Sequence, residues 1–163
     1  MVGRVPVSEA TPGYELPLRL FAAFRAAIDE VHAELARRGH PDVRPMHGFV
    51  FQAIGTDGTT AVDLAARLGV TKQAAGKTIA ALERQGYVER AADPGDARRK
   101  TVRLTARGVE VLALSARVFD QVQDRWAAVI GADRLAALHT DLAAVAPGEL
   151  FRLDAPGWFG ADR

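Results

Sequence analysis

Two short helical segments, a brief turn and a β-hairpin follow one another in residues 60–104, and this order constrains the fold more than any other feature. The stretch TAVDLAARL at residues 60–68 predicts the first helix, with Thr60 as its candidate N-cap. Gly69 ends it, and Thr71 can cap a second helix, KQAAGKTIAALERQ. Two short helices joined in this way indicate a helix-turn-helix.

The strands of a predicted β-hairpin follow these helices directly. YVERA and KTVRL lie on either side of a turn at residues 93–96. Val88 and Val102 can face a core while Arg103 faces solvent, because neighbouring strand residues point to opposite sides. Together the two features predict a winged helix-turn-helix, in a chain that is mainly α-helical with a small β-hairpin wing.

Longer helices flank this block at both ends of the chain. Apolar residues three or four apart predict one helix from about Leu16 to Gly39, and a shorter helix begins at Pro45. Thr105 can cap a long helix that Gly131 ends, and one more helix follows it. The winged helix-turn-helix is therefore expected to sit inside a larger helical framework.

The terminal helices carry more apolar surface than one winged helix-turn-helix can cover. We expect two copies to pack through them as an obligate homodimer, with an intramolecular bundle as the alternative. The predicted regions are an N-terminal dimerisation helix region at 1–43, the winged helix-turn-helix at 44–108, and C-terminal dimerisation helices with a tail at 109–163.

Positive charge is concentrated in the middle of the chain. The net charge is only +1, but residues 67–107 hold 10 basic and 4 acidic side chains, and both flanking regions are net negative. A polyanion attracted by this charge would meet one face of the molecule. Charge alone leaves a solvated basic surface as an equal alternative.

The second helix of the pair has two chemically distinct faces. At about 100° per residue, Ala75, Ile79 and Leu82 share an apolar face. The opposite face is small, polar and cationic, which suits the major groove of DNA. Its members are Lys72, Gln73, Gly76, Lys77, Ala80 and Arg84. An ordinary amphipathic helix with a solvated outer face is the alternative.

Individual residues on the polar face have expected roles. Gln73 can pair with adenine, and Lys72 and Lys77 can contact guanine or phosphate. Gly76 permits a close approach, although tight helix packing would equally explain a mid-helix glycine that costs about 1 kcal/mol relative to alanine. Glu83 lies near this face with the opposite charge, and we expect it outside the groove.

The chain shows no catalytic or metal-binding pattern. It has no Cys, its four His residues lack metal-ligand spacing, and no glycine-rich phosphate loop is present. It also lacks an export leader and an apolar run long enough to span a bilayer. We therefore predict a cytoplasmic protein that is not an enzyme, with no metal, cofactor or membrane partner. Its 18 Arg against 3 Lys suit a GC-rich bacterial genome.

The stretch TAVDLAARLGVTKQAAGKTIAALERQGYVERAADPGDARRKTVRLTARG, with the helices around it, resembles the MarR family of bacterial transcriptional regulators. The resemblance implies a homodimeric winged-helix repressor or activator that binds a short pseudo-palindrome in double-stranded DNA. It also implies a small ligand, often phenolic or anionic, that releases the DNA by binding between the winged helix and the dimer helices. We expect a ligand-responsive repressor.

The family's wing motif, D-x-R-D-x-R, is matched only in part. Asp93, Asp96 and Arg98 fit it, whereas Gly95 replaces the first arginine, whose role is lost or passes to Arg99. The resemblance implies that Arg98 enters the minor groove and that the aspartates position the wing tip; a merely solvated arginine is the alternative. The expected DNA contacts are Thr71, Lys72, Gln73, Gly76, Lys77, Arg84, Arg98, Arg99, Lys100 and Arg103.

A ligand pocket is a further expectation. Arg44, His47 and Phe51 lie at spacings of three and four, hence on one face of the shorter helix. An aromatic cleft with Arg44 or His47 could hold a small aromatic or anionic effector, and plain core packing is the alternative. The expected pocket residues are Phe21, Phe24, Arg44, His47, Phe51 and Trp126.

Two rival functions stay open. One is a winged helix used as a protein-interaction module, and the other is a ligand-binding protein without DNA binding. A steep dependence of binding on salt would distinguish DNA binding from the first. The tail contains Trp158 and Phe159, which we expect to pack on the partner subunit or over a cleft.

Overall fold

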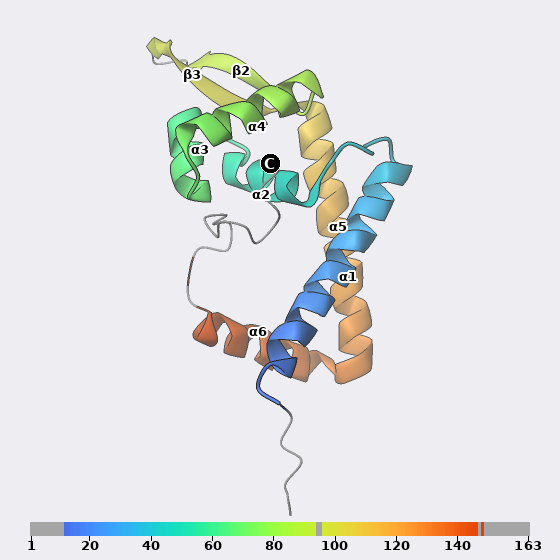
Figure 1. The fold of residues 1–163 in the computed structure, drawn as a ribbon. Coiled ribbons are helices and arrows are strands. Elements are labelled where there is room, and N and C mark those ends of the chain that lie inside the picture. The colour runs from blue at the N-terminus through green and yellow to red at the C-terminus, as the bar shows by residue number, and fades with distance from the viewer. Residues whose placement is uncertain (1–11, 94–95, 147, 149–163) are drawn as a thin grey trace, which may run out of the picture.

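The computed structural model is mainly α-helical with one small antiparallel sheet, which confirms the predicted fold class (Figure 1). It describes residues 12–93, 96–146 and 148, but not the side chains of residues 93 and 96–99. The elements are α1 (Glu15–Arg37), α2 (Pro45–Ile54), β1 (Thr59–Thr60), α3 (Ala61–Leu68), α4 (Lys72–Arg84), β2 (Val88–Asp93), β3 (Asp96–Leu104), α5 (Ala106–Ile130) and α6 (Ala132–Val145).

The molecule has a winged-helix end and a helical stem. Helices α2, α3 and α4 gather with the three strands at one end, while α1 and α5 run side by side away from them (Figure 1). Helix α6 leaves the far end of α5 at a steep angle and contacts α5 there. This arrangement places α4 and the β2–β3 hairpin at the outer surface, opposite the far end of the stem.

Threonine caps fix the starts of three helices. The side chain of Thr60 accepts a hydrogen bond from the backbone N–H of Asp63, and Thr71 accepts one from Ala74, each at 3.1 Å. Thr105 accepts one from the backbone N–H of Gly108 at 3.2 Å. Each cap satisfies a backbone donor that the first helical turn leaves unpaired. The three predicted caps are confirmed.

The sheet contains one strand more than the sequence predicts. Strand β3 lies between β1 and β2, with Val88 opposite Leu104 and Thr59 opposite Val102. Val88 and Val102 are buried, as expected from their alternation. Strand β1 was missed because it has only two residues, too few to show a periodic pattern.

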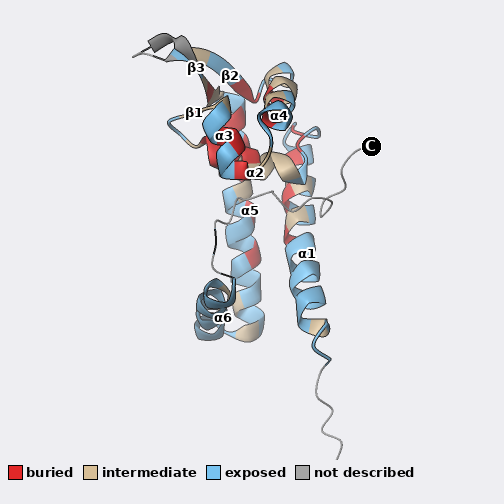
Figure 2. Ribbon diagram, turned by 60° about the vertical axis from the view of Figure 1, so that its left-hand side comes forward, coloured by how far each residue is buried: buried red, intermediate tan, exposed pale blue. Residues whose placement is uncertain are grey.

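Burial is concentrated at the winged-helix end (Figure 2). The fully buried side chains there include Phe51, Leu64, Ile79, Leu82 and Tyr87. Along the stem, the buried side chains of α1 begin only at Ala27 and those of α5 end at Val122, and α6 has none. The far end of the stem therefore has no core of its own among the described residues.

Candidate nucleic-acid interface

Helix α4 presents the two faces that its sequence predicts. Ala75, Ile79 and Leu82 are almost completely buried against the rest of the winged-helix end. The polar residues on the other side are exposed at the outer surface: Lys72, Gln73, Lys77 and Arg84. The helix is held by its apolar side, so the cationic side is free to meet another molecule.

Gly76 lies on the exposed side with open space around it. A Cβ atom added there would meet no atom within 4 Å, leaving out its chain neighbours and the backbone of its own helix. Packing against another part of the described chain therefore does not explain this glycine. Of the two explanations considered from the sequence, close approach by a partner remains.

Glu83 has a partner that accounts for its position. Its carboxylate lies 3.3 Å from a guanidinium nitrogen of Arg90 on β2. Both side chains are a little over one-third exposed, so the pair is screened by solvent and contributes little stability. The pair joins the end of α4 to the wing and neutralises the acidic charge next to the cationic face.

The wing is a hairpin whose strands pair up to its tip. The backbone of Asp93 pairs with that of Asp96, after a shift in register beyond Ala92, and Lys100 lies opposite Ala92. The Lys100 side chain is exposed. The side chains of Asp93, Asp96, Arg98 and Arg99 lie outside the described part of the structure, so their expected roles stay predictions.

Arg103 is less exposed than the sequence predicts. The alternation with Val102 predicts that it faces solvent, but it is half-buried, and its Nε has no hydrogen-bond partner among the described residues. Its stem covers Gly58: a Cβ there would lie 2.7 Å from Cγ of Arg103. The neighbouring loop before β1 covers the arginine because β1 pairs with β3, a contact that sequence reasoning missed.

The base of the wing is locked to the start of α5. Thr105 donates a hydrogen bond from its hydroxyl to the backbone oxygen of Gly86 at 2.6 Å. Arg107 donates to the backbone oxygen of Gly39 at 2.8 Å, and its guanidinium lies 4.8 Å from the ring centre of Tyr87. These contacts connect the winged-helix end to the end of α1, and sequence reasoning had not singled out Arg107 or Tyr87.

The six expected pocket residues lie at several different places in the described chain. Phe51 is fully buried, with its ring centre 5.7 Å from that of Tyr87, so it belongs to the core. Phe24 lines a cavity of about 180 Å³ between α1, α2 and α5, and Arg44 lines a different one. Phe21 is exposed on α1, and Trp126 is at the far end of the stem.

His47 has a structural role at the start of α2. Its Nδ1 accepts a hydrogen bond from the backbone N–H of Arg44 at 3.2 Å. Burial lowers the pKa of His47, and the nearby charges of Arg44 and His32 lower it further. The ring is therefore neutral near pH 7, so it offers no positive charge to an anionic effector.

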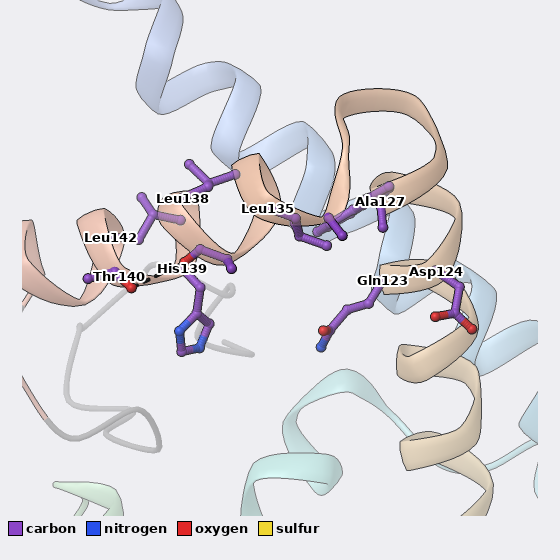
Figure 3. Close-up of a pocket in the computed structure, with 11 residues that line it drawn as sticks. Gln123, Asp124, Ala127, Leu135, Leu138, His139, Thr140 and Leu142 are labelled. Carbon is purple, nitrogen blue, oxygen red and sulfur yellow. Dashed lines mark hydrogen bonds between the residues drawn. The ribbon is translucent and has the colours of Figure 1, made fainter.

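A larger groove lies between α5 and α6, at the far end of the stem. It has a volume of about 660 Å³ and is shown in Figure 3. Leu135, Leu138 and Leu142 of α6 contribute apolar side chains to it, and Gln123 comes from α5. The groove adds to the apolar surface of the far end.

The described residues contain no metal-site cluster of three or more His, Cys, Asp or Glu. Among them, no helix has the length and apolar character needed to cross a membrane.

Comparison with known proteins identifies the same fold. Residues 42–99 match the model of the MarR family. E. coli MarR in its apo form shares 23% identity, with a TM-score of 0.60, over 85% of this chain and 100% of that one. A mutant of S. aureus MepR bound to an oligodeoxyribonucleotide shares 20% identity, with a TM-score of 0.57, over 82% and 96%. No curated protein matches the chain.

The match at residues 42–99 covers α2 to the wing, and the structural likeness extends to the stem helices. The expected resemblance is therefore confirmed: residues 42–99 match the model of the MarR family, and the chain shares its fold with the solved MarR and MepR structures.

Proposed function

We propose that this protein is a transcriptional regulator that binds a pseudo-palindromic DNA operator as a homodimer and responds to a small effector as a repressor. The observation that carries the proposal is the exposed cationic face of α4, opposite a buried apolar face. Short side chains around Gly76 let this helix approach the major groove, and Lys72, Gln73 and Lys77 reach base edges or phosphates.

The wing supports the same function. Lys100 is exposed on β3, and by the family resemblance Arg98 and Arg99 at the tip would contact the minor groove. Arg84 is exposed at the end of α4 and would contact phosphate. Arg103 is half-buried, so we assign it a weaker part in phosphate contact than the sequence alone suggested.

The far end of the stem supports a homodimer. Leu16, Leu18 and Phe21 of α1 are between 51% and 63% exposed, although apolar, and α6 buries no residue in the protomer. A second copy that covers these helices would remove this surface from water. Two copies related by twofold symmetry would then place two α4 helices in major grooves about 10 base pairs apart.

The cavity between α1, α2 and α5 supports a role for an effector. It lies where the stem helices meet the winged-helix end, so a bound molecule would contact both parts. A molecule that binds one relative position of these parts more tightly than another would shift the spacing of the two α4 helices. The DNA affinity would change as a consequence.

Titration of a labelled DNA fragment that carries the protein's own promoter tests DNA binding, with fluorescence anisotropy as the readout. With 6–10 phosphate contacts, affinity should fall by ~10³-fold or more between 50 and 200 mM salt. Lys72→Ala with Lys77→Ala should weaken binding strongly. Arg134→Ala with Arg117→Ala, which removes two exposed stem charges, is the matched control.

The rival functions predict other results. Binding that hardly depends on salt would contradict the DNA proposal and favour a protein-interaction module. A protein that binds neither its promoter nor other genomic fragments, yet binds small molecules, would favour a ligand-binding protein without DNA binding. Equal losses from the α4 and stem pairs of substitutions would contradict the assignment of α4.

A further inference from the structure

Two cavities adjoin where α1 faces the loop before α2. The inner cavity, of about 180 Å³, lies between α1, α2 and α5, and the outer one, of about 440 Å³, opens at the loop and the end of α4. His32 and Val43 line both. A molecule in the inner cavity could therefore extend one end past His32 into the outer cavity.

The inner cavity suits a single aromatic ring. A cavity of about 150 Å³ lined by apolar side chains is known to hold benzene. Phe24, Phe49 and Phe119 supply aromatic walls here, and each comes from a different helix. The volume therefore admits one ring with a small substituent and leaves no room for a fused polycyclic molecule.

The inner cavity offers no positive charge. No Lys or Arg is among its lining residues. His32 is largely neutral, because burial lowers its pKa more than a hydrogen bond to the Val43 backbone and the charge of Asp29 raise it. With one ring nitrogen engaged by Val43, the other nitrogen of a neutral imidazole is an acceptor. The Ser115 hydroxyl already donates to the backbone oxygen of Val111, which leaves the neutral amide of Gln52 as a donor, so a buried anion would be poorly compensated for its lost hydration.

The outer cavity is rich in acceptors. Asp29 and Asp42 contribute two carboxylates, against one guanidinium from Arg44. The side-chain oxygen of Gln85, another lining residue, is buried and has no donor among the described residues. Asp29 is only loosely paired with Arg25, at 3.7 Å. A donor or a positive charge would therefore be better satisfied here than a second carboxylate.

We propose that the double cavity selects a single aromatic ring that carries a neutral hydrogen-bond donor or an amine, and that it rejects organic anions. The ring occupies the inner cavity, and the amine lies between Asp29 and Asp42. The inference rests on the proposed function in one respect, since this molecule would be the effector. It replaces the aromatic or anionic effector considered from the sequence with a narrower chemical class.

Three probes of similar size and shape differ in charge near pH 7: tyramine is a cation, 4-ethylphenol is neutral and 4-hydroxyphenylacetate is an anion. Binding is measured by calorimetry and by thermal shift on the full chain without DNA. Tyramine and 4-ethylphenol should bind, with 4-hydroxyphenylacetate at least about tenfold weaker than tyramine. A carboxylate probe that binds as tightly as tyramine, or no binding by any probe, would overturn the inference.

Substitutions locate the contacts. Asp29→Asn with Asp42→Asn should weaken tyramine about tenfold and leave 4-ethylphenol unchanged. His32→Phe fills the shared wall and should weaken both. Asp57→Asn is the control, because Asp57 is exposed and lines neither cavity. If the double variant binds tyramine as tightly as the unmodified protein, the carboxylates do not select the ligand.

The ligand-binding results do not depend on DNA binding, because these measurements contain no DNA. A protein that fails to bind its promoter would contradict the proposed function without changing the ligand-binding results. Conversely, a protein that binds its promoter but follows the opposite order of probes would keep its function and lose only this inference.

Discussion

The two ends of the molecule differ in where they place their apolar side chains. The winged-helix end buries its apolar residues within one chain: Phe51, Ile79 and Tyr87 are fully buried. The far end of the stem has comparable apolar side chains but leaves them in solvent, with Phe21 51% and Leu138 39% exposed. The first end has its core within one chain, whereas the second leaves apolar surface that the proposed second copy would cover.

In the proposed function, the end with its own core binds DNA and the end without one pairs with a second copy. The buried face of α4 fixes the helix on the core of the winged-helix end, so the backbone that carries the cationic side chains would be in place before the proposed DNA binds. The far stem is incomplete, and the second copy that we propose would complete it. A substitution should therefore affect folding at one end and association at the other.

The largest effect is expected from charges placed in the far stem. Phe21→Asp combined with Leu138→Asp should weaken dimerisation by about 4 kcal/mol, or close to 10³-fold, because each carboxylate loses its hydration at the proposed interface. Multi-angle light scattering over a dilution series measures the change. The melting temperature of the unmodified protein should also rise with its concentration.

Val62 provides the matched control for this experiment. It is an exposed apolar residue on α3, at 55%, and lies at the winged-helix end. Val62→Asp should leave the dimer intact. If the stem variant stays dimeric, the exposed apolar residues of α1 and α6 are not the interface, and an arrangement through another surface must replace the one proposed here.

A smaller effect is expected at the winged-helix end, where the backbone of Gly108 packs closely against Tyr87. The backbone of Gly108 lies so near the Tyr87 carbonyl that a Cβ atom would overlap its oxygen. Gly108→Ala should therefore destabilise the fold by about 3 kcal/mol, at the upper end of the cost of overpacking a core. Urea denaturation measures it, and a variant as stable as the unmodified protein would show that this joint is looser than described.

Much of the winged-helix end could be predicted from the sequence, because its signals are local. Caps at Thr60, Thr71 and Thr105 and alternation at Val88 and Val102 are local signals, and local signals can be read from one chain. They gave the helix bounds and the faces of α4 closely.

Contacts between distant segments were harder to predict. Strand β1 and the cover over Arg103 depend on pairing with β3, and Phe51 belongs to the core because Tyr87 packs against it. Of the six predicted pocket residues, Phe24 and Arg44 line the two adjoining cavities, whereas Phe51 lies in the core. Residues on one helix face can still be directed to a core, a cap or solvent, and helical spacing does not distinguish these outcomes.

The smallest effect is expected from Gly76→Ala, which should change the stability of the protein and its affinity for DNA in opposite directions. Gly76 has room for a methyl group, and alanine is the better helix former, so Gly76→Ala should stabilise the protein by up to about 1 kcal/mol. If the backbone of α4 approaches DNA here, the same methyl group should weaken promoter binding. Denaturation and anisotropy on one preparation measure both.

Ala74→Gly, at an exposed position of the same helix, is the control. It should lower the stability and leave promoter binding unchanged. A Gly76→Ala variant that is more stable and binds DNA as tightly would show that no DNA atom comes close to this position.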